Sequence, residues 1–346
     1  MNDKEKIVNS VVNMLKVNMG LKDDEKVLVV TDVPKAEEWK TKTSAKLKEA
    51  VERSVLAKMV EEIAVEEFPK NPVEFYTYPS VGKHGTYPGK EVEEKMKNAD
   101  VTIAITTYSL THTDARLNAC KAGGRVASMP MFLAEMFSEG GPMAADYRAI
   151  DKETRKIAEW ITKANDVKIT SPGGTDISFS VKGRNGMVDT GIFTEKGSWG
   201  NLPSGEAYTT PVEGTASGKL VVEPKMYADL KEKMTLIFKN GNATGIISGG
   251  KIGDEFRALL DFNKKEEPYI SRRNLAELGI GTNPNAKRPD NLLECEKIRG
   301  TIHLAVGDNL HMGGKVSADL HQDFIISKPT WTLDGKAVMK DGKLLA

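Results

Sequence analysis

DVTIAIT, residues Asp100–Thr106, decides the fold of the first half of the chain. It is an almost unbroken apolar run of strand length, which is typical of a strand buried in a parallel sheet. A predicted helix, Lys90–Lys97, leads into this run, and a second, Thr113–Ala122, follows it and ends at Gly123-Gly124. The alternation of strand and helix indicates a parallel sheet with helices on its faces.

The same rhythm extends on both sides of this run. Short apolar runs predict the strands, and apolar residues at helical spacing predict the helices. The further strands are expected at Lys26–Val30, Val73–Tyr78 and Arg125–Pro130, and the further helices near residues 4–19, 43–67 and 145–164. We therefore expect residues 1–165 to form a Rossmann-like α/β domain with a mostly parallel sheet.

The pattern changes after this domain. Val167–Val188 alternates apolar and polar residues and contains Pro-Gly-Gly and Arg-Asn-Gly turns, which is typical of antiparallel hairpins. Residues 218–223, 233–246 and 330–345 continue this pattern, and one helix is expected at Gly253–Phe262. Residues 166–346 are therefore predicted to form a second domain that is mostly antiparallel β with few helices (α+β).

Composition excludes several classes of protein. The 346 residues carry 49 basic and 49 acidic side chains, so the net charge is zero, which argues against a nucleic-acid coat protein or a polybasic membrane binder. The sequence has no membrane-spanning apolar run, no apolar signal core and no phosphate-loop or dinucleotide-binding motif. Cys120 and Cys295 are interpreted as reduced thiols. We expect a cytoplasmic protein with no nucleic-acid partner, no membrane partner and no nucleotide cofactor.

The clearest chemical signal is DLHQDFIIS, residues Asp319–Ser327. Its β-rich tail predicts a strand, on which His321 and Asp323 would point to the same side. An imidazole beside a carboxylate on one face is a common way to hold a divalent metal. The alternative is a simple surface hydrogen bond between the two side chains.

Three other segments carry side chains of the same kinds. His303 lies in an apolar strand, Glu277 beside a Gly-rich turn, and Glu206 after Pro-Ser-Gly in a segment that resembles a loop. Taken singly, His303 could be a core residue with satisfied hydrogen bonds, and each glutamate a solvated charge. Together with His321 and Asp323, they offer three carboxylates and two imidazoles. Such a set can hold two divalent cations if one carboxylate bridges them.

Four motifs, NLPSGE, ELGIGTNP, GTIHLAVG and HQDF, resemble in order the metal-binding motifs of the aminopeptidase T / aminopeptidase S family. The resemblance implies a homodimeric metallo-aminopeptidase that hydrolyses a small peptide or amide substrate with two divalent ions of zinc, cobalt or manganese. It implies five metal ligands in the second domain, with Glu277 as the bridge: Glu206, Glu277, His303, His321 and Asp323. The family has one more acidic ligand a few residues before the first histidine, for which Glu296 is the candidate, with a solvated charge as its alternative. Either Glu296 or Glu206 is expected to move the proton to the leaving amine in catalysis. The sequence departs from the family at Leu310, where a catalytic tyrosine is expected.

The sequence resembles the 2,5-dihydroxypyridine dioxygenases more distantly. That resemblance implies a single Fe(II), and His321 and Asp323 fit it. Those enzymes have a histidine where this chain has Glu277, and phenylalanines in place of Glu206 and His303. Because all five hydrolase-type positions are filled, the expected function is the two-metal hydrolase. The alternatives are a mononuclear iron dioxygenase, a related metalloenzyme that is not a peptidase, and a metal-binding protein without catalysis.

One segment of the first domain is a candidate for substrate binding. Thr107–Ala119 follows a predicted strand and begins a helix, which puts it at the edge of the sheet where α/β folds bind ligands. His112 and Arg116 are the residues expected to contact substrate. The alternative is that this segment only caps the helix, through Thr111 or Thr113.

Overall fold

The structure of the protein is a computed structural model that describes residues 3–291 and 293–345. The chain folds into two compact units. The first unit extends to Asp151 and also contains Gly191–Ser204, and the second contains Lys152–Thr190 and the chain from Gly205 on. These units are defined by packing, and the chain passes between them three times. The boundary expected at residues 165 and 166 stays a prediction.

The first unit contains a parallel five-stranded sheet with the strand order β2-β1-β3-β4-β8. The four strands predicted from apolar runs are confirmed. The fifth strand was not predicted, because it has only three residues and comes from the segment that returns to this unit. The strands are β1 (Val27–Val33), β2 (Val73–Pro79), β3 (Val101–Thr106), β4 (Arg125–Pro130) and β8 (Trp199–Asn201).

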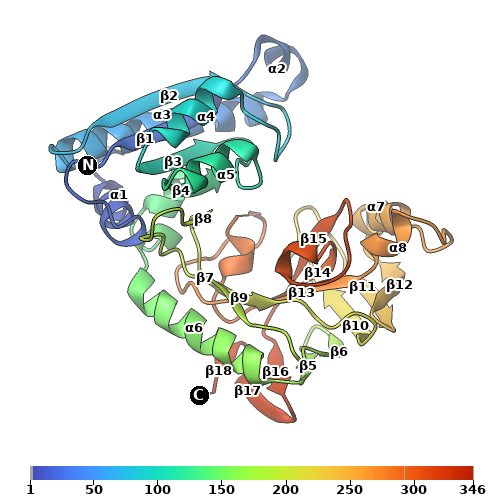
Figure 1. The fold of residues 1–346 in the computed structure, drawn as a ribbon. Helices are drawn as coiled ribbons and strands as arrows, with labels where there is room; N and C mark the ends of the chain where they lie inside the picture. Colours follow the sequence, from blue (N-terminus) through green and yellow to red (C-terminus); the bar gives the residue numbers. More distant parts are fainter. Residues whose placement is uncertain (1–2, 292, 346) are drawn as a thin grey trace. The chain divides into compact units, whose positions relative to one another are not determined.

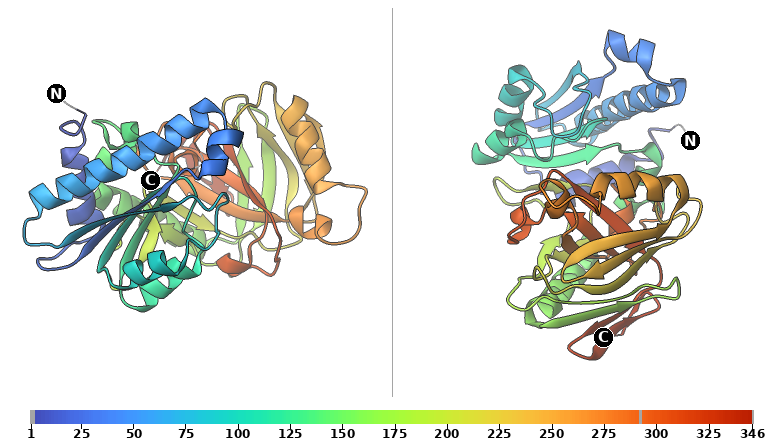
Figure 2. Two further views of the ribbon diagram at one scale, coloured as in Figure 1. Left: turned by 90° about the horizontal axis from the view of Figure 1, so that it is seen from above. Right: turned by 90° about the vertical axis from the view of Figure 1, so that its right-hand side faces the viewer.

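Helices cover both faces of this sheet (Figures 1 and 2). The long helix α3 packs on one face, and α4 and α5 pack on the other through a core that includes Leu28, Met96 and Ala104. The helix expected at residues 4–19 is shorter and changes to π-helical geometry near its middle. The helical segments of this unit are α1 (Val8–Asn13), η1 (Met14–Asn18), α2 (Ala36–Thr41), α3 (Ser44–Glu67), α4 (Lys90–Lys97), α5 (Asp114–Lys121), η2 (Ala134–Phe137) and η3 (Pro142–Ala144). Helix α6 (Tyr147–Lys163) begins in this unit and continues into the second, whose core contains its residues Ile157 and Ile161.

The second unit contains two antiparallel sheets, as the alternating sequence pattern predicts. The larger has the strand order β12-β11-β10-β6-β5-β16-β17-β18, and the smaller β15-β14-β13-β9-β7. The strands of the larger sheet are β5 (Asp166–Thr170), β6 (Asp176–Ser180), β10 (Ser217–Val222), β11 (Met234–Lys239), β12 (Asn242–Ser248), β16 (Thr330–Leu333), β17 (Lys336–Lys340) and β18 (Lys343–Leu344). Those of the smaller are β7 (Met187–Asp189), β9 (Glu206–Thr209), β13 (Leu275–Gly281), β14 (Ile302–Gly307) and β15 (His321–Ile326).

Short helices complete this unit. The helix expected at Gly253–Phe262 begins three residues earlier, because Gly249 takes a left-handed backbone conformation that starts the first turn there. The helical segments are α7 (Gly250–Leu260), α8 (Tyr269–Arg272), η4 (Cys295–Lys297) and η5 (Leu310–Met312). Within residues 3–291 and 293–345, no helix combines the length and the apolar character that a membrane span requires.

The smaller antiparallel sheet has two different faces. Alternate residues of strands β13, β14 and β15 belong to the apolar core that this unit shares with the larger sheet: Leu278, Ile280, Ile302, Leu304, Phe324 and Ile326. Because side chains alternate along a strand, the residues between them point away from this core. These residues include Glu277, His303 and Asp323, so the alternation that builds the core also gathers polar side chains on the opposite face.

Candidate metal centre

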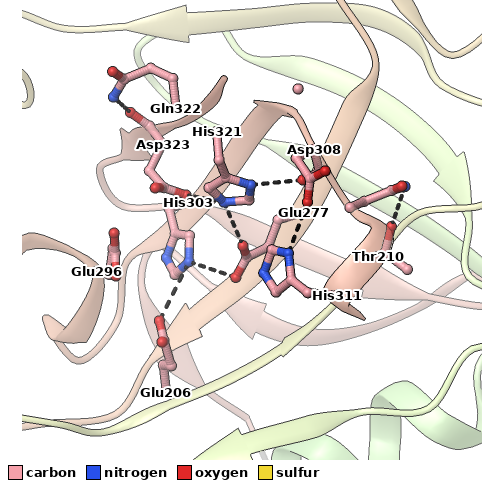
Figure 3. A network of polar contacts seen from close by, with 12 residues as sticks. Glu206, Thr210, Glu277, Glu296, His303, Asp308, His311, His321, Gln322 and Asp323 are labelled. Carbon is pink, nitrogen blue, oxygen red and sulfur yellow. Dashed lines mark hydrogen bonds and ion pairs between the residues drawn. The ribbon is translucent and has the colours of Figure 1, made fainter. Parts of the chain in front are cut away.

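The five predicted ligand residues come together on the smaller sheet of the second unit (Figure 3). His303 is on β14, and His321 and Asp323 are on β15 with one residue between them, as the sequence predicts. Two expectations about local structure are wrong. Glu277 lies within strand β13, and Glu206 is the first residue of strand β9 rather than part of a loop. Both belong to strands because β13 pairs with β9 on one side and with β14 on the other.

Glu277 is at the centre of the cluster. One of its carboxylate oxygens is 3.0 Å from Nε2 of His321, and the other is 3.4 Å from Nε2 of His303. His303 Nε2 is also 3.5 Å from Glu206, and His321 Nε2 is 3.7 Å from Asp323. The ligand atoms therefore form two groups that share Glu277: Glu206, Glu277 and His303 in one, and Glu277, His321 and Asp323 in the other.

Gly279 makes room for one of the imidazoles. It lies opposite His303 in the pairing of β13 with β14, and a Cβ atom built at Gly279 would lie 2.0 Å from Nε2 of His303. No other amino acid fits there while the His303 ring keeps this position. Both Gly residues of ELGIGTNP, Gly279 and Gly281, therefore belong to the strand that carries the site.

Sequence reasoning missed a buried lysine beside the cluster. Lys297, 3% exposed, places its Nζ atom 2.5 Å from Oε1 of Glu206 and 3.0 Å from Oε2 of Glu296. Burial alone would lower the pKa of Lys297, but the neighbouring carboxylates, above all Glu206, hold this pKa well above its usual range. Lys297 is therefore a fixed positive charge. No sequence signal identifies it, because lysines are rarely buried and this one is buried by contacts with distant segments.

The two histidines carry protons in the metal-free protein. Burial would lower the pKa of His303, but a hydrogen bond with Glu277 and the charge of Glu206 raise it to about 9. Burial opposes protonation of His321 as well, but its interactions with Asp323 and Glu277 raise its pKa to about 12. In the absence of a metal, imidazolium protons therefore balance carboxylate charges that a cation could balance instead.

The residues fit a divalent metal ion. The ligand atoms of each three-residue group lie within 4.8 Å of one another, and Oε2 of Glu206 is buried without a hydrogen-bond partner among the described residues. Nδ1 of His321 lies 2.8 Å from the backbone oxygen of Asp308, so it carries a proton and leaves Nε2 facing the carboxylates (Figure 3). Metal-binding histidines are commonly oriented by such a contact. The metal-ligand roles of the five residues stay predictions.

The structure places the two other residues that the aminopeptidase resemblance singled out at the margin of the cluster. Glu296 contacts Lys297, and burial raises its pKa to about 8, but neither three-residue group includes it. Its catalytic role stays a prediction. Leu310 is in η5 and 55% exposed, next to His311, whose ring lies 5.8 Å from the His321 ring. His311 is a polar neighbour of the site to which the sequence analysis gave no role.

His112 and Arg116 belong to the first unit. His112 is exposed and packs edge-on against Trp199. Arg116 is buried, donates from Nε to the backbone oxygen of Thr111 and stacks its guanidinium 3.8 Å from the Trp199 ring. Thr113 caps helix α5 by accepting from the Arg116 backbone N–H, as the structural alternative proposed. These contacts give Arg116 a packing role, and substrate binding by either residue stays a prediction.

Comparisons with known proteins identify relatives of two kinds. A family model described as "NicX: 2,5-dihydroxypyridine 5,6-dioxygenase" matches residues 6–346. The 2,5-dihydroxypyridine 5,6-dioxygenase of Pseudomonas putida KT2440 is 26% identical over 264 residues, which is 70% of this chain and 71% of that protein. A solved structure of the dioxygenase from this organism has a TM-score of 0.71 at 19% identity and covers 99% of this chain and 98% of its own. Wild-type AmpT from Thermus thermophilus has a TM-score of 0.64 at 15% identity over the whole of both chains.

These findings correct the expected function. The resemblance to aminopeptidases is supported as a likeness of fold, through AmpT. The predictions of an aminopeptidase, a hydrolase and a protease are wrong, because the family match and the sequence relative both indicate a dioxygenase. The error has a physical origin, since one fold can present similar metal-binding side chains for different reactions. Over almost its whole length, the chain belongs to the NicX family of 2,5-dihydroxypyridine 5,6-dioxygenases.

Proposed function

We propose that the protein is a metal-dependent dioxygenase that opens the ring of a dihydroxylated aromatic compound of the 2,5-dihydroxypyridine type. The family supports the reaction class and implies a metal, for which iron is our proposal. The observation that carries the proposal is the group formed by Glu277, His321 and Asp323, whose ligand atoms lie within 4.8 Å of one another. It supplies three ligands of the imidazole and carboxylate types that non-haem Fe(II) oxygenases use.

This group differs from the usual facial triad in its composition. Glu277 stands where the resemblance to the dioxygenases implies a histidine, so the group contains one imidazole and two carboxylates. A second imidazole is close, because His303 Nε2 lies 3.4 Å from the same Glu277. We propose that Glu277, His321 and Asp323 hold one ferrous ion and that His303 positions Glu277 from the buried side. This replaces the expected pair of zinc, cobalt or manganese ions.

The buried lysine supports one ion rather than two. Glu206 belongs to the second possible group, but its Oε1 atom is already 2.5 Å from the Lys297 ammonium. A dication bound to the other oxygen of Glu206 would be repelled by this fixed charge at close range, where water screens little. The Glu277, His321 and Asp323 group has no lysine or arginine within ion-pair distance among the described residues.

The residues around this group have separate tasks. A bound ferrous ion would supply O₂ activation and a position for a ring hydroxyl. The backbone oxygen of Asp308 holds the Nδ1 proton of His321 and so keeps its Nε2 directed at the carboxylates. His311 is 57% exposed at its side chain, and its Nδ1 lies 2.9 Å from Oδ1 of Asp308. We propose that His311 moves a proton to or from the ring hydroxyl, since its ring is oriented and lies beside that of His321.

Oxygen uptake tests the proposal directly. The purified chain, loaded with Fe(II) without air, is mixed with 2,5-dihydroxypyridine in an oxygen electrode. We expect one O₂ consumed for each ring opened, with both oxygen atoms in the ring-opened product. His321→Gln should remove this activity and the bound iron, whereas the surface variant Asp254→Asn should change neither. Iron binding without O₂ uptake on this or other dihydroxylated rings would contradict the proposal.

A further inference from the structure

The parallel sheet of the first unit has a topological switch point that carries a cavity. With the order β2-β1-β3-β4-β8, the chain moves outward from β1 in one direction to β2 and in the other to β3. In open α/β sheets, ligands bind in the crevice at the carboxyl ends of the two strands where this direction changes. Here those strands are β1 and β3.

A cavity of about 330 Å³ lies at this place. Its wall includes Thr107 and Tyr108, which follow β3 directly, and Met131, which follows β4. The other side is formed by the end of α2, the link to α3 and the first turns of α3, and it includes Thr41, Lys42, Thr43, Lys46, Glu49 and Arg53. The volume is in the range of small-molecule sites in proteins. Asp32 near the end of β1 accepts the backbone N–H of Thr107 at 2.5 Å, which fixes the two strand ends relative to each other.

The cavity wall is rich in positive charge. Lys42, Lys46 and Arg53 all line it, with Glu49 as the acidic lining residue. Lys42 is neutralised by Glu38 at 2.6 Å. Neither Lys46 nor Arg53 has a carboxylate within ion-pair distance among residues 3–291 and 293–345. Asp32, Glu49 and Glu52 lie near enough to act on the Arg53 charge but form no ion pair with it, so Arg53 and Lys46 remain available to an anion.

Arg53 is the most informative of these residues. It is only 4% exposed, yet its guanidinium bonds to neutral oxygens, the backbone oxygen of Phe132 at 3.3 Å and Oγ1 of Thr107 at 3.1 Å. Buried charges in proteins are normally paired with an opposite charge. These two bonds use Nε and one terminal nitrogen, so the planar fork that recognises carboxylates and phosphates has donors left over.

Two uncharged donors belong to the same wall. The Tyr108 hydroxyl accepts from Lys42 Nζ at 2.6 Å, which leaves its own O–H as a donor. Nδ1 of His84 accepts the Ser109 backbone N–H at 3.0 Å, and burial lowers the pKa of His84, so the neutral ring carries its proton on Nε2. The cavity therefore combines cationic and neutral donors, as anion sites do.

We propose that this cavity binds a small anion, recognised through a carboxylate or phosphate group by Arg53 and Lys46. The site belongs to the first unit and none of its residues is part of the metal centre. Its existence does not depend on the dioxygenase reaction. Carboxylates and phosphates both present a compact group of anionic oxygens. Titration with one anion of each kind distinguishes them.

Calorimetric titration of the full chain with inorganic phosphate and, separately, with malonate tests this proposal, with ionic strength held constant by chloride. We expect saturable binding of one anion per chain. Binding of phosphate alone assigns a phosphate-bearing ligand, binding of malonate alone assigns a carboxylate, and binding of both assigns a site for either group.

Two variants locate the site. Lys46→Met and Arg53→Lys should each weaken binding about tenfold or more, since one charge-assisted hydrogen bond contributes at least that much. Lys48→Met is the matched control, because Lys48 is on the same helix, its side chain is 75% exposed and it does not line the cavity. Lys46 is exposed, so its variant tests the site even if Arg53→Lys does not fold. Absence of binding by both anions, or equal binding by wild type and Lys46→Met, would overturn the proposal.

Discussion

The two ligand groups that share Glu277 differ in what already balances their charge. The group with Glu206 and His303 is buried, and Lys297 contacts one of its carboxylates. The group with His321 and Asp323 is reached from solvent, with the His321 side chain 26% exposed, and only imidazolium protons balance its charge. A metal can replace a proton far more easily than it can expel a lysine. Ligand type alone therefore does not determine where an ion binds, and the cation already present must be considered too.

The largest effect should come from removing a ligand that only one group contains. His321→Gln is expected to abolish iron binding and O₂ uptake, because it leaves only the carboxylates of Glu277 and Asp323 in the group that is open to solvent (the open group). Glu206→Gln should keep one ion and lower activity by no more than the roughly 10–100-fold that is usual for an outer partner of a metal site. Metal content by mass spectrometry and oxygen uptake measure both variants. If Glu206→Gln lost the iron and His321→Gln kept it, the ion would bind in the buried group of Glu206, Glu277 and His303.

Removing the charge of Lys297 should make the two ligand groups more alike in their ability to bind a metal ion. In the metal-free protein, Lys297→Met leaves buried carboxylates without their cation, and the free energy of unfolding should fall by about 3–5 kcal/mol. Added Mn²⁺ should restore part of this loss and raise the metal content from one ion to two per chain. Urea unfolding with and without Mn²⁺ measures the effect. The exposed variant Lys168→Met should stay within about 0.5 kcal/mol of wild type. A Lys297→Met chain that still takes one ion would show that Lys297 does not control the stoichiometry.

The pH dependence of metal affinity separates the groups further. The pKa of His321 in the metal-free protein is about 12, so this ring is protonated at neutral pH and must lose its proton when it binds an ion. Affinity should therefore rise with pH, about tenfold per unit for one released proton, or roughly 100-fold from pH 6 to pH 8. Titrations in buffers of different ionisation enthalpy count the protons. An affinity that does not change over this range would exclude His321 as a ligand.

The sequence predicted the elements that follow from local pattern. Apolar runs identified four of the five parallel strands, and the spacing of His321 and Asp323 predicted their common face correctly. It could not identify β8, whose three residues join the sheet through pairing with β4. It misplaced Glu277 and Glu206, because a glycine beside a carboxylate suggests a turn until the neighbouring strands are known. Lys297 was missed for the same reason, since its burial depends on contacts with Glu206, 91 residues away.

The function was misjudged for a different reason. All five ligand positions are filled, and ligand number alone favoured a two-metal hydrolase. The choice depends on the charge balance around those ligands and on the family, neither of which a set of short motifs contains. Glu277 remains the residue that most distinguishes this chain from the pattern expected of a facial iron triad.

Gly279 has a consequence for how this site can vary among related chains. Its missing side chain is the space that the His303 ring occupies, so the two positions cannot change independently. A relative with a larger residue at position 279 must have lost the imidazole at position 303 or turned it away. A larger residue at position 279 would therefore mark chains without the buried ligand group, whereas glycine there is compatible with an imidazole or with a phenylalanine ring at position 303.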